Sequence, residues 1–182
     1  MHIVIVSGPE ATGKSAIANK LSKELNYSYL SKDVIKEKLY DTRKHSTWDH
    51  AWYEQEAKRQ FFEQIRIATE AKQDVIIESN FDTADKDKLA GIMPQGCTIS
   101  EIYCSSRGFT SFKRFVRRNE SGNRHRGHHD RRWYLKVFSQ DCARLFGSDW
   151  PHYPVALSDK LLRLNTTKIA EVDYEKIKLF LK

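Results

Sequence analysis

The sequence predicts an α/β fold of three layers, in which a parallel five-stranded sheet lies between two layers of helices. Short apolar runs of strand length alternate with longer segments of helical pattern, which is typical of parallel sheets covered by helices on both faces. The chain has 182 residues, the size of one domain, and no Pro/Gly-rich stretch marks a boundary. We therefore expect one domain over residues 1–182. The expected strands are 2–7, 28–31, 74–79, 98–104 and 161–165.

A glycine-bounded loop follows the first expected strand and matches the pattern G-x-x-x-x-G-K-S. Its residues are Gly8, Pro9, Glu10, Ala11, Thr12, Gly13, Lys14 and Ser15, and a helical pattern follows over 15–25. A strand, this loop and a helix in succession are the context of a P-loop, whose backbone N–H groups surround phosphate oxygens. Lys14 would then reach the β- and γ-phosphates, and the Ser15 hydroxyl would ligate Mg²⁺. The context favours a P-loop NTPase fold with ATP and Mg²⁺ over an incidental Gly-rich turn.

Asp33 follows the second expected strand and is the candidate general base. In a parallel sheet the carboxyl ends of the strands face the ligand site, so this carboxylate is expected to approach the phosphates and an acceptor hydroxyl. The alternative is that Ser31 or Asp33 only caps the next helix. Lys36 lies one helical turn further on and could bind an anionic group of the acceptor.

Residues 33–73 form a long helical segment that we expect to carry acceptor-binding side chains. Its aromatic residues are mostly expected in the core, because aromatic stripes at helical spacing usually pack there. Trp48 and Trp52 lie one turn apart beside a polar stretch and are the candidates for lining an acceptor pocket.

Glu78 and Asn80 follow the third strand, again at a carboxyl end. Glu78 could order Mg²⁺ through its waters or hold the acceptor, and Asn80 could bind substrate. The alternative is an ordinary polar loop after a strand.

The basic residues are concentrated in residues 107–132, which we expect to form a helical lid. This segment holds nine Lys/Arg and two Asp/Glu, so it accounts for the whole net charge of +7. Two helices are expected within 108–145, on either side of a polar hinge at 119–130. Guanidinium groups stabilise a transferring phosphoryl group, and a hinge lets them close over bound nucleotide. The alternative is a solvated charged surface.

Individual lid residues have distinct expected roles. Arg114, Arg117 and Arg118 have the i, i+3, i+4 spacing of one helix, and Arg124 and Arg126 follow in the hinge. We expect Arg114 to hold nucleotide, Arg117 and Arg124 to act on the transferring phosphate, and Arg126 to contact the acceptor. The histidines of the hinge (His125, His128 and His129) have metal-ligand spacing, but the surrounding cations disfavour bound Zn²⁺.

Composition excludes several other classes of protein. No apolar run approaches the ~18 residues of a membrane span, so we expect a cytoplasmic protein without a membrane partner. The three cysteines, Cys97, Cys104 and Cys142, contain no Cys-x-x-Cys pair, which argues against a disulfide framework and a thiolate zinc site. A last helix is expected at roughly 171–181.

Four segments together resemble the small P-loop kinases that include polynucleotide 5′-hydroxyl kinase, chloramphenicol phosphotransferase and the zeta-toxin relatives. They are 8–15, 31–36, 75–81 and the Arg114-x-x-Arg117-x₆-Arg124-His-Arg-Gly-His128 run. The resemblance covers nearly the whole chain and implies strand order 2-3-1-4-5, ATP and Mg²⁺.

The same resemblance assigns roles to single residues. It implies that Asp33 is the catalytic aspartate, that Lys36 is a basic substrate contact, and that Arg114, Arg117 and Arg124 belong to the lid. Asn165 and Thr166 fall where the relatives contact adenine. The Pro9-Glu10-Ala11 stretch departs from the family's small glycine-rich loop and resembles that of nicotinamide riboside kinases, which leaves the acceptor open.

The leading functional hypothesis is transfer of the γ-phosphate of ATP to a hydroxyl of a small molecule. A polynucleotide 5′-hydroxyl kinase is the alternative enzyme, although a nucleic-acid groove normally needs basic residues beyond the lid. A nucleotide-dependent ATPase or switch that binds a protein partner is the alternative from another class. Such a switch would need neither an acceptor pocket nor a base at Asp33.

Overall fold

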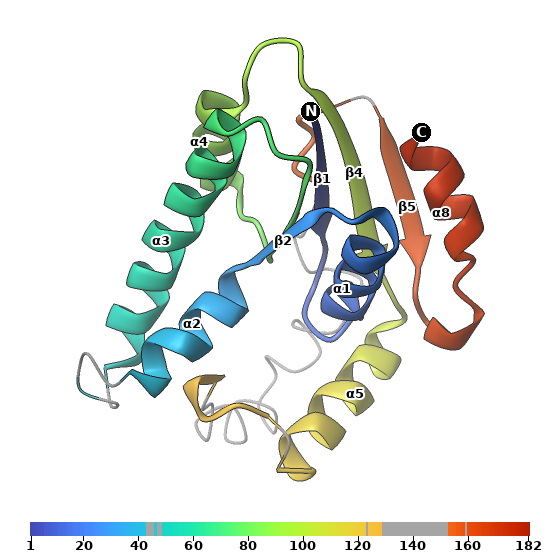
Figure 1. The fold of residues 1–182 in the computed structure, drawn as a ribbon. Coiled ribbons are helices and arrows are strands. Elements are labelled where there is room, and N and C mark those ends of the chain that lie inside the picture. The colour runs from blue at the N-terminus through green and yellow to red at the C-terminus, as the bar shows by residue number, and fades with distance from the viewer. Residues whose placement is uncertain (43–45, 47–48, 123, 129–152, 159) are drawn as a thin grey trace.

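The computed structural model describes residues 1–42, 46, 49–122, 124–128, 153–158 and 160–182. Its centre is a five-stranded sheet of order β2-β3-β1-β4-β5, in which every neighbouring pair is parallel (Figure 1). The predicted fold class and strand order are therefore confirmed. The strands are β1 (His2–Ser7), β2 (Ser28–Ser31), β3 (Val75–Glu78), β4 (Thr98–Ser105) and β5 (Leu161–Asn165).

The helices follow the expected alternation with three differences. The expected helical segment 33–73 is two helices, because Asp49 caps the second one with a hydrogen bond from the Trp52 N–H. A helix over 83–92, which the sequence analysis does not single out, begins with a capping box of Asp82 and Asp85. The second helix expected after the hinge falls mostly in 129–152, outside the described residues. The helices are α1 (Lys14–Leu25), α2 (Lys32–Asp41), α3 (His50–Glu70), α4 (Thr83–Ile92), α5 (Gly108–Glu120) and α8 (Tyr174–Leu181), with 3₁₀ turns η1 (Arg126–His128) and η2 (Ile169–Glu171).

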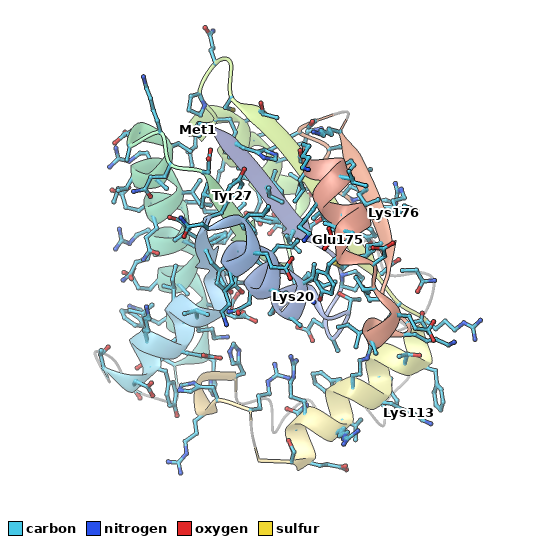
Figure 2. All side chains as sticks on the ribbon, turned by 45° about the vertical axis from the view of Figure 1, so that its right-hand side comes forward. Met1, Lys20, Tyr27, Lys113, Glu175 and Lys176 are labelled. Atoms are coloured by element: carbon cyan, nitrogen blue, oxygen red, sulfur yellow. The ribbon has the colours of Figure 1, made fainter. Side chains whose placement is uncertain are left out.

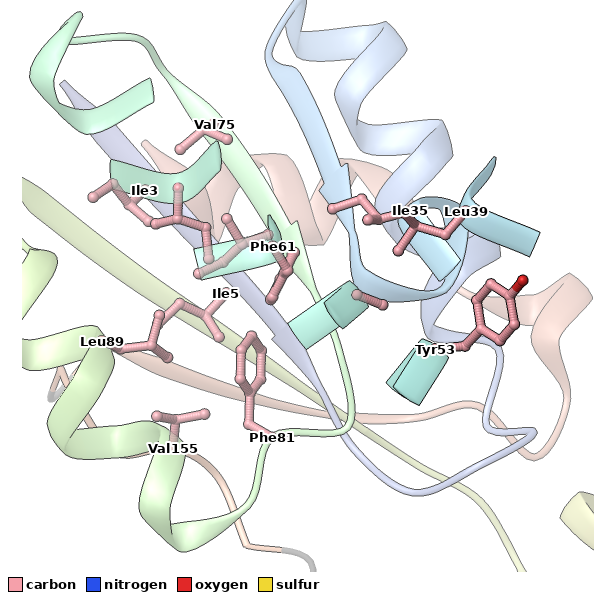
Figure 3. Close-up of a cluster of buried hydrophobic side chains, with 13 residues drawn as sticks. Ile3, Ile5, Ile35, Leu39, Tyr53, Phe61, Val75, Phe81, Leu89 and Val155 are labelled. Atoms are coloured by element: carbon pink, nitrogen blue, oxygen red, sulfur yellow. The ribbon is translucent and has the colours of Figure 1, made fainter. Parts of the chain in front are cut away.

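The two faces of the sheet are covered by different helices, as the alternation of side chains along β1 requires. Ile3 and Ile5 point into one cluster with side chains of α2, α3 and α4, part of which Figure 3 shows. Val4 and Val6 point into a second cluster with α1 and α8. Both clusters exclude water from the sheet, and each fully buried side chain of this kind contributes about 1.5–3 kcal/mol.

The carboxyl end of the sheet collects the segments that carry the predicted chemistry. Ser31, Glu78 and Val6 lie in one row across β2, β3 and β1. Met1 and Lys113 lie at opposite ends of the molecule, which places α5 at the end where the strands terminate (Figure 2). In the described part of the chain, no helix combines the length and apolar character needed to cross a membrane.

Candidate active site

The loop between β1 and α1 is a backbone cradle whose shape depends on glycine. Gly8 has φ +133°, and a Cβ there would lie 2.1 Å from the Cys104 carbonyl oxygen. Gly13 has φ +88°, and Ala11 also adopts a left-handed conformation with φ 56°. These conformations turn successive backbone groups to one side of the loop. The predicted P-loop is therefore formed by close approach of main chain to β4, which no side chain at position 8 would permit.

Thr166 and Thr167 follow β5 and form a short segment, here called the strap, that is hydrogen bonded to this loop. Thr166 is fully buried, and its hydroxyl lies 2.5 Å from the Thr12 carbonyl oxygen and 2.9 Å from that of Ser105. Arg114 donates from Nη2 to the carbonyls of Thr166 (2.8 Å) and Thr167 (3.0 Å). The strap thus joins the P-loop, β4 and α5 in one hydrogen-bonded unit.

Lys14 and Ser15 begin α1 at the mouth of the loop. Lys14 is only 6% exposed, and its Nζ donates to the Pro9 carbonyl at 2.7 Å, whereas Ser15 is exposed. The first N–H groups of a helix have no partner within the helix, so the start of α1 can receive an anion. The ammonium group therefore lies within the loop, bound to its main chain.

Glu78 is a buried carboxylate at the floor of the site. It is 3% exposed, and its Oε2 accepts hydrogen bonds from Ser31 Oγ (2.8 Å) and Tyr29 OH (3.2 Å). Burial raises the pKa of Glu78, Asp33 acts in the same direction, and Lys14 with the two hydroxyl donors opposes the rise. The charges of Lys14, Asp33 and Glu78 are therefore close enough to act on one another.

One cavity of about 440 Å³ joins the predicted donor and acceptor residues. Asp33 lies in the first turn of α2, while Ser31, at the N-cap, directs its hydroxyl to Glu78 rather than to the helix. Neither residue therefore makes the side-chain cap that the alternative interpretation proposed. The predicted residues that line the cavity are Glu10, Ala11, Gly13, Lys14, Ser15, Asp33, Lys36, Glu78, Asn80 and Arg124.

An ion-pair cluster that the sequence analysis did not identify lies in the same cavity. Glu54 of α3 accepts from Lys36 Nζ at 2.7 Å and from Lys32 Nζ. Although burial favours the neutral acid, the two ammonium groups hold the pKa of Glu54 at about 2, so it is ionised at neutral pH. Glu54 lies far in sequence from Lys32 and Lys36, so only the packing of α3 against α2 shows that the three side chains meet.

The lid contributes a different set of arginines from the predicted set. Arg118 and Arg124 line the cavity. Arg117 and Arg126 are exposed and do not line it, and Arg114 is bound to the strap. The side chain of Arg124 also lies 3.4 Å from Asn119 Oδ1 and over the Phe115 ring.

The turn η1 docks on α2 through two histidines. His128 Nε2 lies 2.9 Å from Glu37 Oε1, and His125 Nε2 lies 3.1 Å from Asp41 Oδ1. Between them Gly127 is buried, and a Cβ there would lie 3.2 Å from Tyr40 Cβ. This part of the predicted lid therefore contacts α2, the helix that carries Asp33 in its first turn.

Three further predicted residues, Trp52, Asn165 and Thr166, do not line the cavity. Trp52 packs against Tyr53 and the core, Asn165 is exposed and accepts from the Thr167 N–H, and Thr166 is turned inward to the P-loop. Trp48 lies outside the described residues, as does His129 of the histidine run. The roles proposed for these residues stay predictions.

The residues present fit a nucleotide with its magnesium ion. The glycine cradle, Lys14 and the start of α1 suit a phosphate chain, and Ser15 and Glu78 supply oxygen ligands on its border. Among the described residues no group of three or more His, Cys, Asp or Glu could hold a metal. Mg²⁺ binds through one or two protein oxygens together with substrate phosphates, and Ser15 and Glu78 could offer such oxygens.

Comparison with models of known protein families assigns the chain to one family. The family model described as an AAA domain matches residues 3–139, more than half of the sequence, and the chain belongs to this family. A comparison with curated proteins found no match.

Solved structures share the fold over almost the whole chain. A "putative kinase" from Chloroflexus aurantiacus J-10-fl has 27% identity and a TM-score of 0.86, covering 99% of this chain and 96% of its own. A sugar kinase from Janibacter sp. HTCC2649 (14% identity, TM-score 0.57) covers 99% and 93%. Shikimate kinase from Acinetobacter baumannii in complex with shikimate (14% identity, TM-score 0.54) covers 99% and 92%. The fold is that of the small P-loop kinases.

Proposed function

We propose that this member of the AAA-domain family is an ATP-dependent phosphotransferase that moves the γ-phosphate of ATP to a hydroxyl of a small molecule. One observation carries the proposal: a single cavity holds the P-loop lysine, an exposed carboxylate and two lid arginines. Phosphoryl transfer requires a held phosphate, neutralised charge and an oriented hydroxyl, which the lysine, the arginines and the carboxylate respectively would supply.

We assign phosphate binding and proton transfer to different residues of the cavity. The P-loop backbone and Lys14 bind the phosphates, and Arg118 and Arg124 neutralise charge on the transferring group. Asp33 orients the acceptor hydroxyl and takes its proton. Ser15 and Glu78 would hold Mg²⁺, which would supply positive charge to the phosphates.

A small acceptor suits this cavity better than a polynucleotide. A volume of about 440 Å³ must hold the end of the nucleotide and the acceptor together. Two of the fold relatives are a sugar kinase and a shikimate kinase, and both names refer to small compounds with hydroxyl groups. These names support a hydroxyl acceptor without identifying it.

Asp33→Asn tests the proposal. ATP turnover is measured with sugars, polyols, hydroxy acids, nucleosides and 5′-hydroxyl oligonucleotides, and phosphorylated product is identified by mass spectrometry. The variant should lose about 10²- to 10⁴-fold in transfer, the range for loss of a general base, with nucleotide affinity unchanged. Asp87→Asn, an exposed carboxylate on α4, is the matched control.

Other results would replace the proposal. If Asp33→Asn lowers the rate of phosphoryl transfer by only a few-fold, Asp33 is not the general base. Preference for 5′-hydroxyl oligonucleotides indicates a polynucleotide kinase, and hydrolysis that no acceptor stimulates indicates an ATPase or switch.

A further inference from the structure

We infer that the acceptor is a small hydroxylated anion, whose carboxylate or phosphate group is bound by Lys32 and Lys36 while its hydroxyl meets Asp33. This inference rests on the proposed function and specifies its substrate class. It is carried by the Lys32, Glu54 and Lys36 cluster in the acceptor half of the cavity.

The cluster holds more positive charge than its one carboxylate balances. Two ammonium groups share Glu54, and the side chains of Lys32 and Lys36 are only 18% and 14% exposed, so water screens them weakly. Both lysines also lie in the first half of α2, where the helix dipole disfavours cations. Within the cluster two partly desolvated ammonium groups therefore share one carboxylate, and Asp33 supplies a second carboxylate in the same cavity.

Glu54 accepts only some of the N–H groups that the two lysines can donate. A lysine ammonium has three N–H donors, and each of these lysines gives one to that carboxylate. Glu54 is the most accessible member, with a 44% exposed side chain, so an entering anion must displace or bypass this carboxylate to reach the remaining lysine donors. Asp33 lies between the two lysines in sequence and also lines the cavity.

The lining around the cluster is polar. His50, Glu54 and Asn80 line this half together with the two lysines, and no Phe, Tyr or Trp lines the cavity among the residues that the structure describes. The nearby rings of Phe61, Phe62 and Phe81 line a separate cavity of about 180 Å³ behind Lys32 and Glu54. The described residues of this half offer hydrogen-bond donors and acceptors that suit a hydroxylated acid.

Pairs of acceptors that differ at one terminal group, anionic in one member and neutral in the other, test the inference. Glycerate is compared with glycerol and gluconate with sorbitol for the carboxylate, and glycerol 3-phosphate with glycerol for the phosphate. The wild-type protein should prefer the anionic member by at least about tenfold in kcat/KM. Lys36→Gln should lower kcat/KM for anionic acceptors about 10- to 100-fold, as loss of a hydrogen bond between charged groups does, and leave the neutral members within about threefold. Lys38→Gln, on an exposed face of the same helix, is the control.

A second variant and a binding assay give independent readouts. Glu54→Gln removes the resident counter-charge and should widen the preference for anions, with a lower KM for them. Equal use of charged and neutral members, or an unchanged preference in Glu54→Gln, would overturn the inference while the kinase proposal stands.

If no acceptor is phosphorylated, the kinase proposal fails, and the anion site is decided by thermal stabilisation with a non-hydrolysable ATP analogue present. Stabilisation by gluconate but not sorbitol, lost in Lys36→Gln, supports the site. Equal effects of both compounds refute it.

Discussion

The P-loop and the acceptor side of the cavity are held in place by different kinds of interaction. The loop is fixed by main chain, because Gly8 lies against the Cys104 carbonyl and Thr166 is hydrogen bonded to the Thr12 carbonyl. The acceptor side is fixed by polar side chains, such as the ion pair of Lys36 with Glu54 and the hydrogen bond of His128 with Glu37. Buried main-chain contacts cannot change partners without local unfolding, whereas ion pairs at a cavity wall can exchange one partner for a ligand.

The energies of these contacts support the contrast. A buried hydrogen-bonding group left without a partner costs about 1–3 kcal/mol, so the P-loop has little freedom to rearrange. Glu54 is 44% exposed, so its ion pair with Lys36 is partly screened by water, and a ligand that carries its own negative charge can take the place of this carboxylate. We therefore expect substitutions in the loop to abolish binding of the donor, and substitutions on the acceptor side to alter which acceptor is used.

The largest effect is expected for Lys14→Ala. The variant removes the buried ammonium that donates to Pro9 and is aimed at the phosphates. Turnover of ATP should fall at least about 10³-fold, because this group acts on both the bound nucleotide and the transferring phosphate. The fold should remain, since the backbone cradle and the Thr166 strap do not depend on this side chain.

Nucleotide affinity by calorimetry and the melting temperature are measured together for Lys14→Ala. Lys23→Ala, an exposed lysine on the same helix, is the matched control. A variant that binds and turns over ATP like the parent would contradict the assignment of the P-loop.

A smaller effect separates the lid arginines from one another. Arg124→Gln should reduce kcat about 10- to 100-fold, less than the 10²–10³ of a donor in a water-excluded site, because Arg124 lies in a solvent-accessible wall. Arg117→Gln should stay within about twofold, since Arg117 is exposed and does not line the cavity. Single-turnover rates with saturating ATP distinguish the two. An equal loss in both variants would mean that α5 turns its other face to the nucleotide during the reaction.

The same contrast explains how far the sequence could predict the site. The P-loop was predictable because its chemistry is local: glycines at fixed spacing and the strand before them determine the backbone. Asp33, Lys36, Glu78 and Asn80 were placed in one cavity by a topological rule, since they follow strands that end at the same edge.

The remaining side chains depend on how helices rotate and pack. Arg117 and Arg118 are neighbours about 100° apart around α5, and sequence alone does not say which one faces the cavity. Glu54 meets Lys36 only because α3 packs on α2. Thr166, expected at the adenine, is turned to the P-loop by a hydrogen bond 154 residues away in sequence.

The smallest expected effect is a pH dependence of the lid contact at His128. Burial lowers the pKa of His128, Arg124 and Lys36 add to the lowering, and Asp33 and Glu37 oppose it. The docked turn therefore holds the neutral imidazole, which donates to Glu37. Because the undocked side chain binds a proton more readily, the contact is fully stable above a pH of about 6.5 and weakens as the pH falls below it. One proton limits the slope to about 1.4 kcal/mol per pH unit.

Amide hydrogen exchange of residues 124–128 measures this pH dependence. It is compared between the parent and His128→Gln at pH 7.5 and pH 5.5. Gln keeps a donor for Glu37 but does not titrate, so the difference in protection between the two proteins should change with pH. His2→Gln is the control, because burial also lowers the pKa of His2, yet that residue contacts Tyr27 and Ser100 far from the lid. Its substitution should leave the exchange of 124–128 unchanged. If His128→Gln and the parent keep the same difference at both pH values, the lid is held by the packing of Gly127 on Tyr40 rather than by the charge state of the histidine.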